Sequence, residues 1–427
     1  MKKIFLISTL ISFFYFIFSI FINIPWIKDI ACQFGYFLAI YLVLFIAIIP
    51  GFIFVFMFIS LLLNKKEKHR CDTKEKDVTV LIPLYNAQNS IKETVNSIIN
   101  QKYCGNILIY MIDDGSTDDY LPIVKSMNLD SKITLIKSPH VGKAKALNEA
   151  LKYVRTKYTI TVDSDTVLHP LAIKNIVQKL ENSDKNTAAV AGCLLVKNAK
   201  KNFITKLQEW DYTLGIFGVK LYQGNYNSTL VAQGAFSIYK TNILKQIGGW
   251  QNCVGEDIVL TWELLSRGYT TSFAKDAIAL TEVPESLKDL KRQRKRWARG
   301  MIEAFKKVKT VTSLKMKFKS KFLICLNIFF PFIDIATLIF IPLGIILLLL
   351  GNNLLISWLY LLVILFGLLL CLIIDIKRKH VLKKLDYKLK RRSILAFLVY
   401  TLLYTFILAP SCLVGYISEI INSNKKW

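Results

Sequence analysis

The sequence predicts an α/β protein in which a doubly wound, mostly parallel sheet is combined with transmembrane helices at both ends of the chain. Two observations lead to this prediction. Long apolar blocks lie only near the termini, and the polar segment between them alternates β-branched apolar runs with amphipathic ones. Alternating strands and helices form parallel sheets that are covered on both faces. Ligands of such sheets bind at the carboxyl ends of the strands, where we therefore expect the functional residues.

The composition is too apolar for an ordinary soluble protein: 53% of the 427 residues are hydrophobic. A helix needs about 20 apolar residues to cross the hydrocarbon core of a bilayer. Blocks of that length cover residues 4–24, 35–63, 322–350, 354–374 and 394–421. The first block lacks a small-residue cleavage site, which favours a retained membrane helix over a secretory signal.

These blocks divide the chain into three parts. We expect two transmembrane helices in residues 1–63 and a globular domain in residues 64–320 that ends in a basic interfacial helix. About three membrane or interfacial helices are expected in residues 321–427.

The formal net charge of +26 is concentrated beside the apolar blocks, at residues 65–70, 288–321 and 377–392. The positive-inside rule then places the domain in the cytoplasm, so we expect a multi-pass protein of the plasma membrane. The charge favours anionic lipid and phosphate-bearing substrates. No motif supports nucleic-acid binding. Eight cysteines without metal-ligand spacing predict free thiols.

The predicted elements of the domain follow from local patterns. β-branched apolar runs indicate strands, Ser90 and Glu93 form a capping box at a helix start, and Pro170 suits the start of a later helix. In chain order the elements are a strand at 78–82, a helix at 90–99, strands at 107–112 and 133–136, a helix at 142–154, a strand at 157–162, a helix at 170–180 and a strand at 188–196.

Pairs of carboxylates follow two of the predicted strands. One strand runs into Asp113 and Asp114, and another ends in Asp163 and Asp165, which an extended chain points to the same side. Like charges so placed repel each other unless a cation, a raised pKa or water intervenes. Oxygen ligands suit Mg²⁺ or Mn²⁺. A single acidic pair is most simply a solvated turn, whereas two pairs on the same sheet edge indicate a site.

The second half of the domain is less regular. The aromatic amphipathic stretch 203–223 is expected near the membrane or under the site, and residues 231–236 offer small side chains where backbone can approach a ligand. Glu256 and Asp257 open a predicted helix over 258–268, and the helix dipole alone is a sufficient explanation for two acidic residues there.

A basic helix is predicted at 287–304, where Gln293, Arg296 and Trp297 share one face. An amide, a guanidinium and an indole in a row suit an anionic or sugar-like ligand. The alternative is a basic amphipathic helix lying on acidic lipid. The two interpretations are compatible if they apply to opposite faces.

The motifs of the domain are, in order, Pro83-Leu84-Tyr85-Asn86, Asp113-Asp114-Gly115-Ser116, Gly142-Lys143-Ala144 with Ala146-Leu147-Asn148, Asp163-Ser164-Asp165, Gly255-Glu256-Asp257 and Gln293-Arg294-Lys295-Arg296-Trp297. Taken together, these motifs resemble the membrane-embedded processive glycosyltransferases of family 2, which include the synthases of cellulose, hyaluronan, chitin and poly-N-acetylglucosamine. Two N-terminal membrane helices and a compact domain are most similar to the bacterial poly-β-1,6-N-acetylglucosamine synthases.

The sequence departs from the family pattern at one position and from a common phosphate-binding motif at another. Ala87 follows Asn86 where the family often has Glu, which affects the rim of the nucleotide pocket. The Gly142-Lys143 pair is not a P-loop, because the upstream glycine and the following Ser or Thr are missing.

The resemblance implies a GT-A-type fold and a metal-dependent, inverting β-glycosyltransferase that extends a polysaccharide and helps to export it. It further implies a UDP-sugar donor, with UDP-N-acetylglucosamine preferred, a growing polysaccharide as acceptor, a divalent cation (Mg²⁺ or Mn²⁺) and a small membrane or export partner. Alternatives are a synthase of hyaluronan or another β-linked polymer, a single transfer to a lipid-linked acceptor, or a non-catalytic membrane scaffold. The scaffold alternative is disfavoured because it has no need of the acidic pairs.

The resemblance also assigns roles to individual residues. It implies nucleotide contacts for Pro83, Tyr85, Asp113 and Asp114, and donor contacts for Lys143 and Asp163. Asp163 and Asp165 are the implied cation ligands, and of the two Asp165 is favoured as the direct one.

On the acceptor side, the resemblance implies that Asp257, flanked by Glu256, is the general base. Gln293, Arg296 and Trp297 are expected to close over the pyrophosphate and the acceptor end. Gly234 and Phe236 are expected along the acceptor channel.

Overall fold

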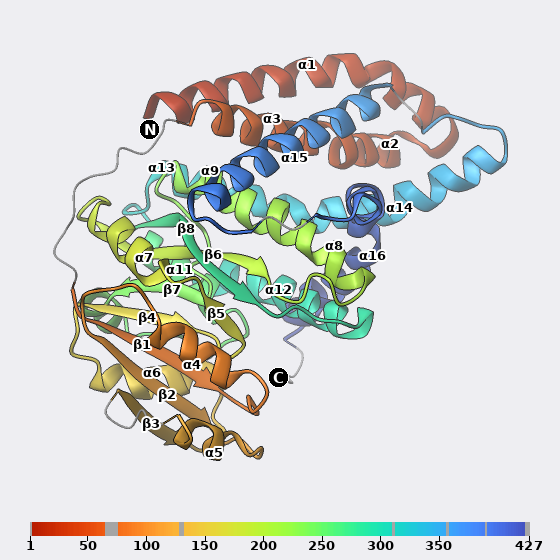
Figure 1. The fold of residues 1–427 in the computed structure, drawn as a ribbon. Helices are drawn as coiled ribbons and strands as arrows, with labels where there is room; N and C mark the ends of the chain where they lie inside the picture. Colours follow the sequence, from red (N-terminus) through yellow and green to blue (C-terminus); the bar gives the residue numbers. More distant parts are fainter. Residues whose placement is uncertain are drawn as a thin grey trace.

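The computed structural model describes residues 2–64, 76–127, 132–309, 312–355, 358–388 and 391–422. In this part of the chain one eight-stranded sheet forms the domain, in the order β3-β2-β1-β4-β7-β6-β8-β5 (Figure 1). Its strands are β1 (Val78–Leu84), β2 (Ile107–Asp114), β3 (Ile133–Ser138), β4 (Tyr158–Val162), β5 (Thr166–Leu168), β6 (Thr187–Val196), β7 (Phe236–Lys240) and β8 (Thr270–Thr281).

Most neighbouring strands run parallel, which confirms the predicted fold class. The strands β3, β2, β1 and β4 are mutually parallel, as are β6 and β8. The exceptions are β7, which is antiparallel to both β4 and β6, and β5, which is antiparallel to β8. Every residue of β1, β4 and β6 is buried, because helices cover both faces of a parallel sheet.

Alternate side chains of the strands enter two separate cores. Val80 and Ile82 pack with α4 (Ile91–Ile99), α5 (Tyr120–Lys125) and α7 (Ala172–Glu181) on one face. Leu81 packs on the other face, and the helices there are α6 (Lys143–Tyr153), α10 (Thr241–Gln246) and α11 (Glu256–Ser266).

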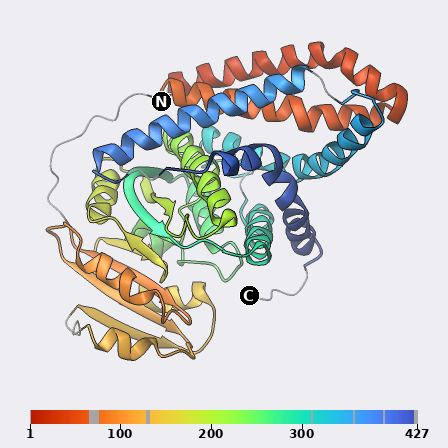
Figure 2. The ribbon, with the colours of Figure 1, turned by 45° about the vertical axis from the view of Figure 1, so that its right-hand side comes forward.

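Apolar helices at both ends of the chain lie together beside the domain. Figures 1 and 2 show α1 (Lys2–Phe34), α3 (Ile49–Leu62) and α15 (Trp358–Lys384) side by side in one layer. The remaining helical elements of this region are α2 (Tyr36–Val43), η1 (Leu44–Ile48), α13 (Phe318–Leu326), η3 (Asn327–Phe329), α14 (Phe330–Leu349) and α16 (Ile394–Ile420).

Four stretches of the described residues are long and apolar enough to cross a membrane: Lys3–Phe34, Tyr36–Leu62, Phe318–Leu349 and Ile394–Ile420. The predicted block at 354–374 lies mainly in α15, which continues into basic residues and is not one of the four. The predicted basic run at 65–70 lies outside the described residues.

A middle layer joins the sheet to the apolar helices. It consists of α8 (Phe203–Asp211), the π-helix η2 (Tyr212–Gly218), α9 (Val219–Gly224) and the basic helix α12 (Leu287–Lys307). The segment α8-η2-α9 packs against β6 and β8 on one side and against α3, α15 and α16 on the other. The stretch predicted to lie near the membrane or under the site therefore lies between the sheet and the apolar helices.

Candidate active site

The two acidic pairs meet at the same edge of the sheet. β1 lies between β2 and β4, and all three run in the same direction. Asp113 and Asp114 end β2, while Asp163 and Asp165 follow β4 directly. This is the carboxyl edge, where ligands of doubly wound sheets bind.

Asp113 and Asp114 organise the loops around this edge. Asp113 accepts hydrogen bonds from the Ser116 amide and the Tyr120 hydroxyl, both at 2.8 Å. Asp114 accepts from the backbone amides of Val141 at 2.8 Å and Gly142 at 3.0 Å. Both carboxylates are buried and help to set the position of the loop that leads into α6.

A flat aromatic surface lies next to Asp114. The rings of Tyr85 and His140 are stacked with their centroids 4.5 Å apart, and the His140 ring nitrogen lies 2.8 Å from the Asp114 carbonyl. The Tyr85 side chain is 49% exposed. An exposed ring beside hydrogen-bonding groups suits a planar base. His140 has no motif around it, and sequence reasoning missed it.

Lys143 links the strand-end aspartates to the acidic start of α11. Its ammonium lies 2.5 Å from Asp163 Oδ1 and 3.7 Å from Glu256 Oε1. Burial opposes the charged ammonium, but the two carboxylates outweigh it, so the pKa of Lys143 is raised. Burial raises the pKa of Glu256 to about 7, an effect that Lys143 opposes and Asp257 adds to.

Gly234 provides the space for this contact. A Cβ atom at that position would stand 2.8 Å from Lys143 Nζ and 3.8 Å from Glu256 Oε1. The neighbouring Ala235 carbonyl accepts a hydrogen bond of 3.3 Å from the Asp163 amide. The small-residue stretch predicted to approach a ligand therefore lies directly against the charged cluster.

Asp165 has the environment of a cation ligand. Its Oδ1 accepts hydrogen bonds from the hydroxyls of Thr166 at 3.1 Å and Thr281 at 3.3 Å. Burial and the nearby Asp163 carboxylate raise the pKa of Asp165 to about 6, a cost that a bound cation would relieve.

These donors are carboxylate oxygens, which fit Mg²⁺ or Mn²⁺. Within the described residues no three His, Cys, Asp or Glu side chains are grouped to complete a metal site. Mg²⁺ sites are typically shared by one or two carboxylates and substrate phosphates, so Asp163 and Asp165 together with a diphosphate fit such a site.

The loop before Asp257 is held by α12. The fully buried Glu303 carboxylate accepts hydrogen bonds from the amides of Val254 at 2.8 Å and Gly255 at 3.3 Å. The backbone of this loop also packs directly against the backbone of α12. A Cβ added to Gly255 would lie 2.7 Å from the Gly300 Cα. Asp257 itself accepts a hydrogen bond through Oδ1 from the Ile258 amide at 2.8 Å.

The contact between Gly255 and Gly300 also orients the face of α12 that was predicted to bind a ligand. Gln293 and Trp297 precede Gly300 by seven and three residues, a spacing that places all three on one helical face. The Gln293 side-chain oxygen is buried without a hydrogen-bond partner among the described residues. Arg296 is exposed, and Trp297 is 40% exposed.

Arg294 supports this face, although sequence reasoning gave it no role. Its guanidinium pairs with Asp211 at 2.6 Å and lies 4.0 Å from the centroid of the Trp297 ring. The Tyr404 hydroxyl of α16 also reaches Asp211, at 3.3 Å. The orientation of Trp297 is thus linked to α16, one of the four candidate membrane-spanning stretches, through one buried ion pair.

Comparison with known proteins identifies the class to which this fold and site belong. Residues 76–300, more than half of the chain, match the family model described as glycosyltransferase like family 2. The chain therefore belongs to glycosyltransferase family 2, and it is an enzyme of that class.

Two curated relatives of this chain are named for N-acetylglucosamine transfer or polymer synthesis. The chain is 30% identical over 236 residues to an N-acetylglucosaminyltransferase of Bradyrhizobium diazoefficiens, covering 52% of this chain and 48% of the relative. It is 29% identical over 240 residues to a poly-β-1,6-N-acetyl-D-glucosamine synthase of Staphylococcus aureus, covering 56% of this chain and 57% of the relative. The matches thus span about half the length of these curated relatives.

A solved structure confirms the GT-A-type fold. The mannosyltransferase PcManGT of Pyrobaculum calidifontis, determined in complex with GDP-Man and Mn²⁺, superposes with a TM-score of 0.60 at 17% identity. The superposition covers 93% of this chain and 99% of that one, so the likeness extends to the apolar helices as well as the sheet.

Proposed function

We propose that this protein transfers N-acetylglucosamine from UDP-N-acetylglucosamine to the growing end of a β-linked polysaccharide, with inversion at the anomeric carbon. The observation that carries the proposal is the position of Asp257. It opens α11 beside the Lys143-Asp163-Glu256 cluster, and the loop before it is held by Glu303. Two relatives named for N-acetylglucosamine transfer support the choice of sugar.

In this proposal the donor lies along the carboxyl edge of the sheet. The exposed Tyr85 ring stacks on the uracil, and the loop shaped by Asp113 and Asp114 surrounds the nucleoside. Lys143 lies beside the diphosphate. Asp163 and Asp165 would hold Mg²⁺ or Mn²⁺, which as a Lewis acid neutralises the charge that develops on the departing UDP.

The acceptor approaches from the side of α11 and α12. Asp257 takes the proton from the acceptor hydroxyl as that oxygen attacks the anomeric carbon, on the face opposite the departing UDP. A single displacement of this kind converts an α-linked donor into a β-glycoside and needs no covalent intermediate. Trp297 offers its exposed ring to the acceptor sugar, and the Gln293 amide offers it a hydrogen-bond acceptor.

We further propose that the domain faces the cytoplasm and that the apolar helices help to export the product. The basic runs beside those helices support this orientation. Protease added outside intact cells is expected to leave residues 76–309 uncut, whereas cleavage of that region in intact cells would reverse the topology.

The decisive experiment is a donor screen with the purified full-length protein in lipid nanodiscs. UDP-N-acetylglucosamine, UDP-glucose, UDP-glucuronic acid and GDP-mannose are offered separately with Mg²⁺ or Mn²⁺, and the product linkage is determined by mass spectrometry and NMR. A β-linked N-acetylglucosamine polymer is expected. Preference for another donor, or a single addition to lipid, would overturn the assignment.

A variant tests the role of Asp257. Asp257→Asn is expected to lower kcat about 10²- to 10⁴-fold, the usual contribution of a general base, with the Kd for UDP unchanged. Asp184→Asn is the matched control, because Asp184 is an exposed carboxylate whose side chain accepts a hydrogen bond from Asn227. A loss confined to UDP affinity would contradict the assigned role.

A further inference from the structure

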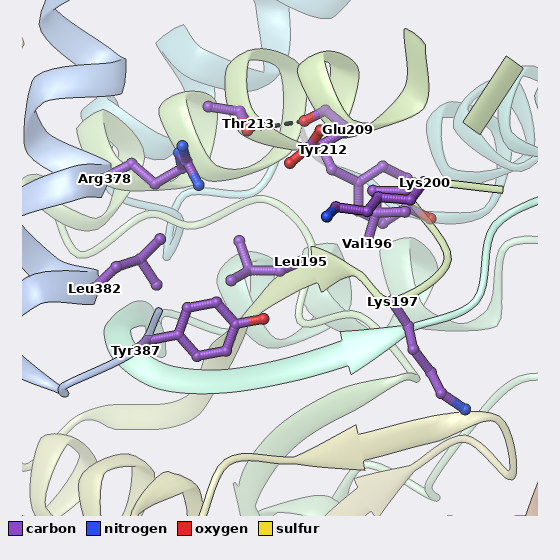
Figure 3. Close-up of a pocket in the computed structure, with 11 residues that line it drawn as sticks. Leu195, Val196, Lys197, Lys200, Glu209, Tyr212, Thr213, Arg378, Leu382 and Tyr387 are labelled. Carbon is purple, nitrogen blue, oxygen red and sulfur yellow. Dashed lines mark hydrogen bonds between the residues drawn. The ribbon is translucent and has the colours of Figure 1, made fainter. Parts of the chain in front are cut away.

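A cleft lies between the sheet and the apolar layer, apart from the candidate active site. Figure 3 shows that it opens where the end of β6 faces η2 and the basic end of α15. None of the residues that were given a catalytic or substrate-binding role lines it. The charged side chains around this cleft therefore need an explanation other than sugar transfer.

Arg378 of α15 is the central cation of the cleft. Its side chain is 9% exposed, and its Nε and one Nη nitrogen donate to the same oxygen of Asp375 at 3.3 and 3.2 Å. Within the described residues these are its only hydrogen bonds, although a guanidinium has five N–H groups. A buried cation with unused donors costs free energy, which a ligand with acceptor oxygens would recover.

The charges behind Arg378 are not balanced. Asp375 also lies 2.6 Å from Arg392 and 2.7 Å from Lys379, so one carboxylate is shared by three cations. Burial and the neighbouring Arg378 lower the pKa of Arg392 to about 10, although Asp375 and Glu209 oppose that change. Positive charge is therefore in excess on this side of the cleft.

Two further donors line the cleft. Lys200 lies on the turn after β6, and Tyr387 follows α15 with its hydroxyl directed toward the β6 side (Figure 3). Lys197 points away and pairs with two glutamates at 2.6 and 3.0 Å. Within the described residues Glu209 is the one carboxylate of the lining, and the cations of Lys200 and Arg378 outnumber it. The cleft thus offers a net positive charge and several hydrogen-bond donors.

The cleft also lies at a level of the protein where lipid headgroups are expected. α15 is apolar up to Ile374 and becomes basic at Lys377-Arg378-Lys379, a change typical of the membrane–water boundary. Figures 1 and 2 show α15 beside α1, which belongs to one of the candidate membrane-spanning stretches. Basic pockets beside membrane helices on the cytoplasmic side bind anionic lipid headgroups.

We propose that this cleft binds a phosphate group whose oxygens accept hydrogen bonds from the Arg378 guanidinium, the Lys200 ammonium and the Tyr387 hydroxyl. The planar fork of an arginine matches the geometry of phosphate oxygens, and a lysine adds a point charge. The phosphate belongs either to the headgroup of an anionic lipid or to a soluble phosphate, because both present the same oxygens to these donors.

The test measures phosphate binding by the full-length protein in nanodiscs. Thermal unfolding is followed in phosphatidylcholine nanodiscs with or without phosphatidylglycerol, and in phosphatidylcholine nanodiscs titrated with inorganic phosphate at constant ionic strength. A ligand that binds only the folded state raises the unfolding temperature, so phosphatidylglycerol or inorganic phosphate is expected to raise it. A rise with phosphatidylglycerol alone identifies a lipid source, and a rise with inorganic phosphate alone identifies a soluble one; each result supports the site.

Variants assign the effect to the cleft, with affinity taken from the concentration dependence of the rise. Lys200→Met is expected to weaken binding about 10- to 100-fold and Tyr387→Phe about 3- to 10-fold, the usual effects of losing a charged and a neutral hydrogen bond. Lys201→Met and Tyr153→Phe are the matched controls, because both side chains are exposed and neither lines the cleft. An unfolding temperature that neither ligand raises, or an equal rise in the cleft variants and the controls, would overturn the proposal.

A second measurement uses the wild-type protein and does not depend on the variants. Hydrogen–deuterium exchange is compared with and without the ligand that raises the unfolding temperature. Slower exchange is expected in residues 197–202 and 382–388, the segments that carry Lys200 and Tyr387. Protection confined to other segments would contradict binding in this cleft, whichever sugar the enzyme transfers.

Discussion

The contact between Gly255 and Gly300 is where α12 meets the loop before Asp257, and it leads to the sharpest prediction. A Cβ atom added at Gly300 would lie 2.8 Å from the Gly255 Cα and 3.3 Å from its nitrogen. Both neighbours are backbone atoms, so no side chain can rotate away. The Gly300→Ala variant must therefore move α12 away from the start of α11.

The size of the movement and its effects can be worked out from these distances. Carbon atoms prefer separations of about 3.5–4.0 Å, so α12 and α11 must separate by roughly 0.7–1.2 Å. Overpacking costs about 1–3 kcal/mol, while replacing a helical glycine by alanine recovers about 1 kcal/mol. The net loss of stability is then about 0–2 kcal/mol, whereas a displacement of about 1 Å at reacting groups can cost roughly 10²-fold in rate.

The Gly300→Ala variant is therefore expected to fold but to transfer sugar slowly. The assay is kcat for UDP release in nanodiscs, with thermal unfolding measured on the same samples. Gly344→Ala is the matched control, because the nearest atom to a Cβ at that helical glycine is a leucine side chain 3.8 Å away. If Gly300→Ala turns over at the wild-type rate, α12 does not set the position of the loop before Asp257 for transfer, which would refute the prediction.

Three other changes test the same site. Glu303→Gln should lower kcat about tenfold and cost about 1–3 kcal/mol of unfolding free energy, because it weakens a buried acceptor for two amides. An equal loss of UDP affinity would argue against a role confined to the loop before Asp257. Gly234→Ala should displace the Lys143 ammonium from Asp163 and raise the KM for the donor about tenfold. The same substitution should have almost no effect on that KM in a Lys143→Met background, whereas additive effects of the two substitutions would refute the contact. The pKa of Glu256 is raised from 4.5 to about 7, so the folded protein binds more protons there and this contribution to stability is lost as pH rises through that window. The unfolding temperature of Glu256→Gln should therefore depend less on pH between 4.5 and 7 than that of the wild type. An unchanged pH dependence of the unfolding temperature would contradict the raised pKa.

The parallel half of the fold could be predicted because its signals are local. Continuous apolar runs define β1, β2, β4 and β6, and between them lie amphipathic helices, such as α4 and α7, whose apolar stripes repeat every three or four residues. The carboxyl-edge rule then placed Asp113, Asp114, Asp163 and Asp165 on one edge without any knowledge of long-range contacts.

The rest of the sheet could not be predicted in the same way. The pairing of β7 with β4 joins residues about 80 positions apart, such as Thr159 and Tyr239. β8 is interrupted by a register shift against β6 near Lys275 and Asp276, so it shows no continuous apolar run. Pairings at such separation leave little trace in a local pattern.

The sequence by itself determined the family motifs, the apolar blocks and the acidic edge, because each depends on residue type at short spacing. Only the tertiary structure decided which distant side chains complete the site. Glu303 and Gly300 hold the loop before Asp257, and Arg294 supports Trp297. Their positions depend on how the middle layer packs between the sheet and the apolar helices, and that packing is set by contacts across the whole chain.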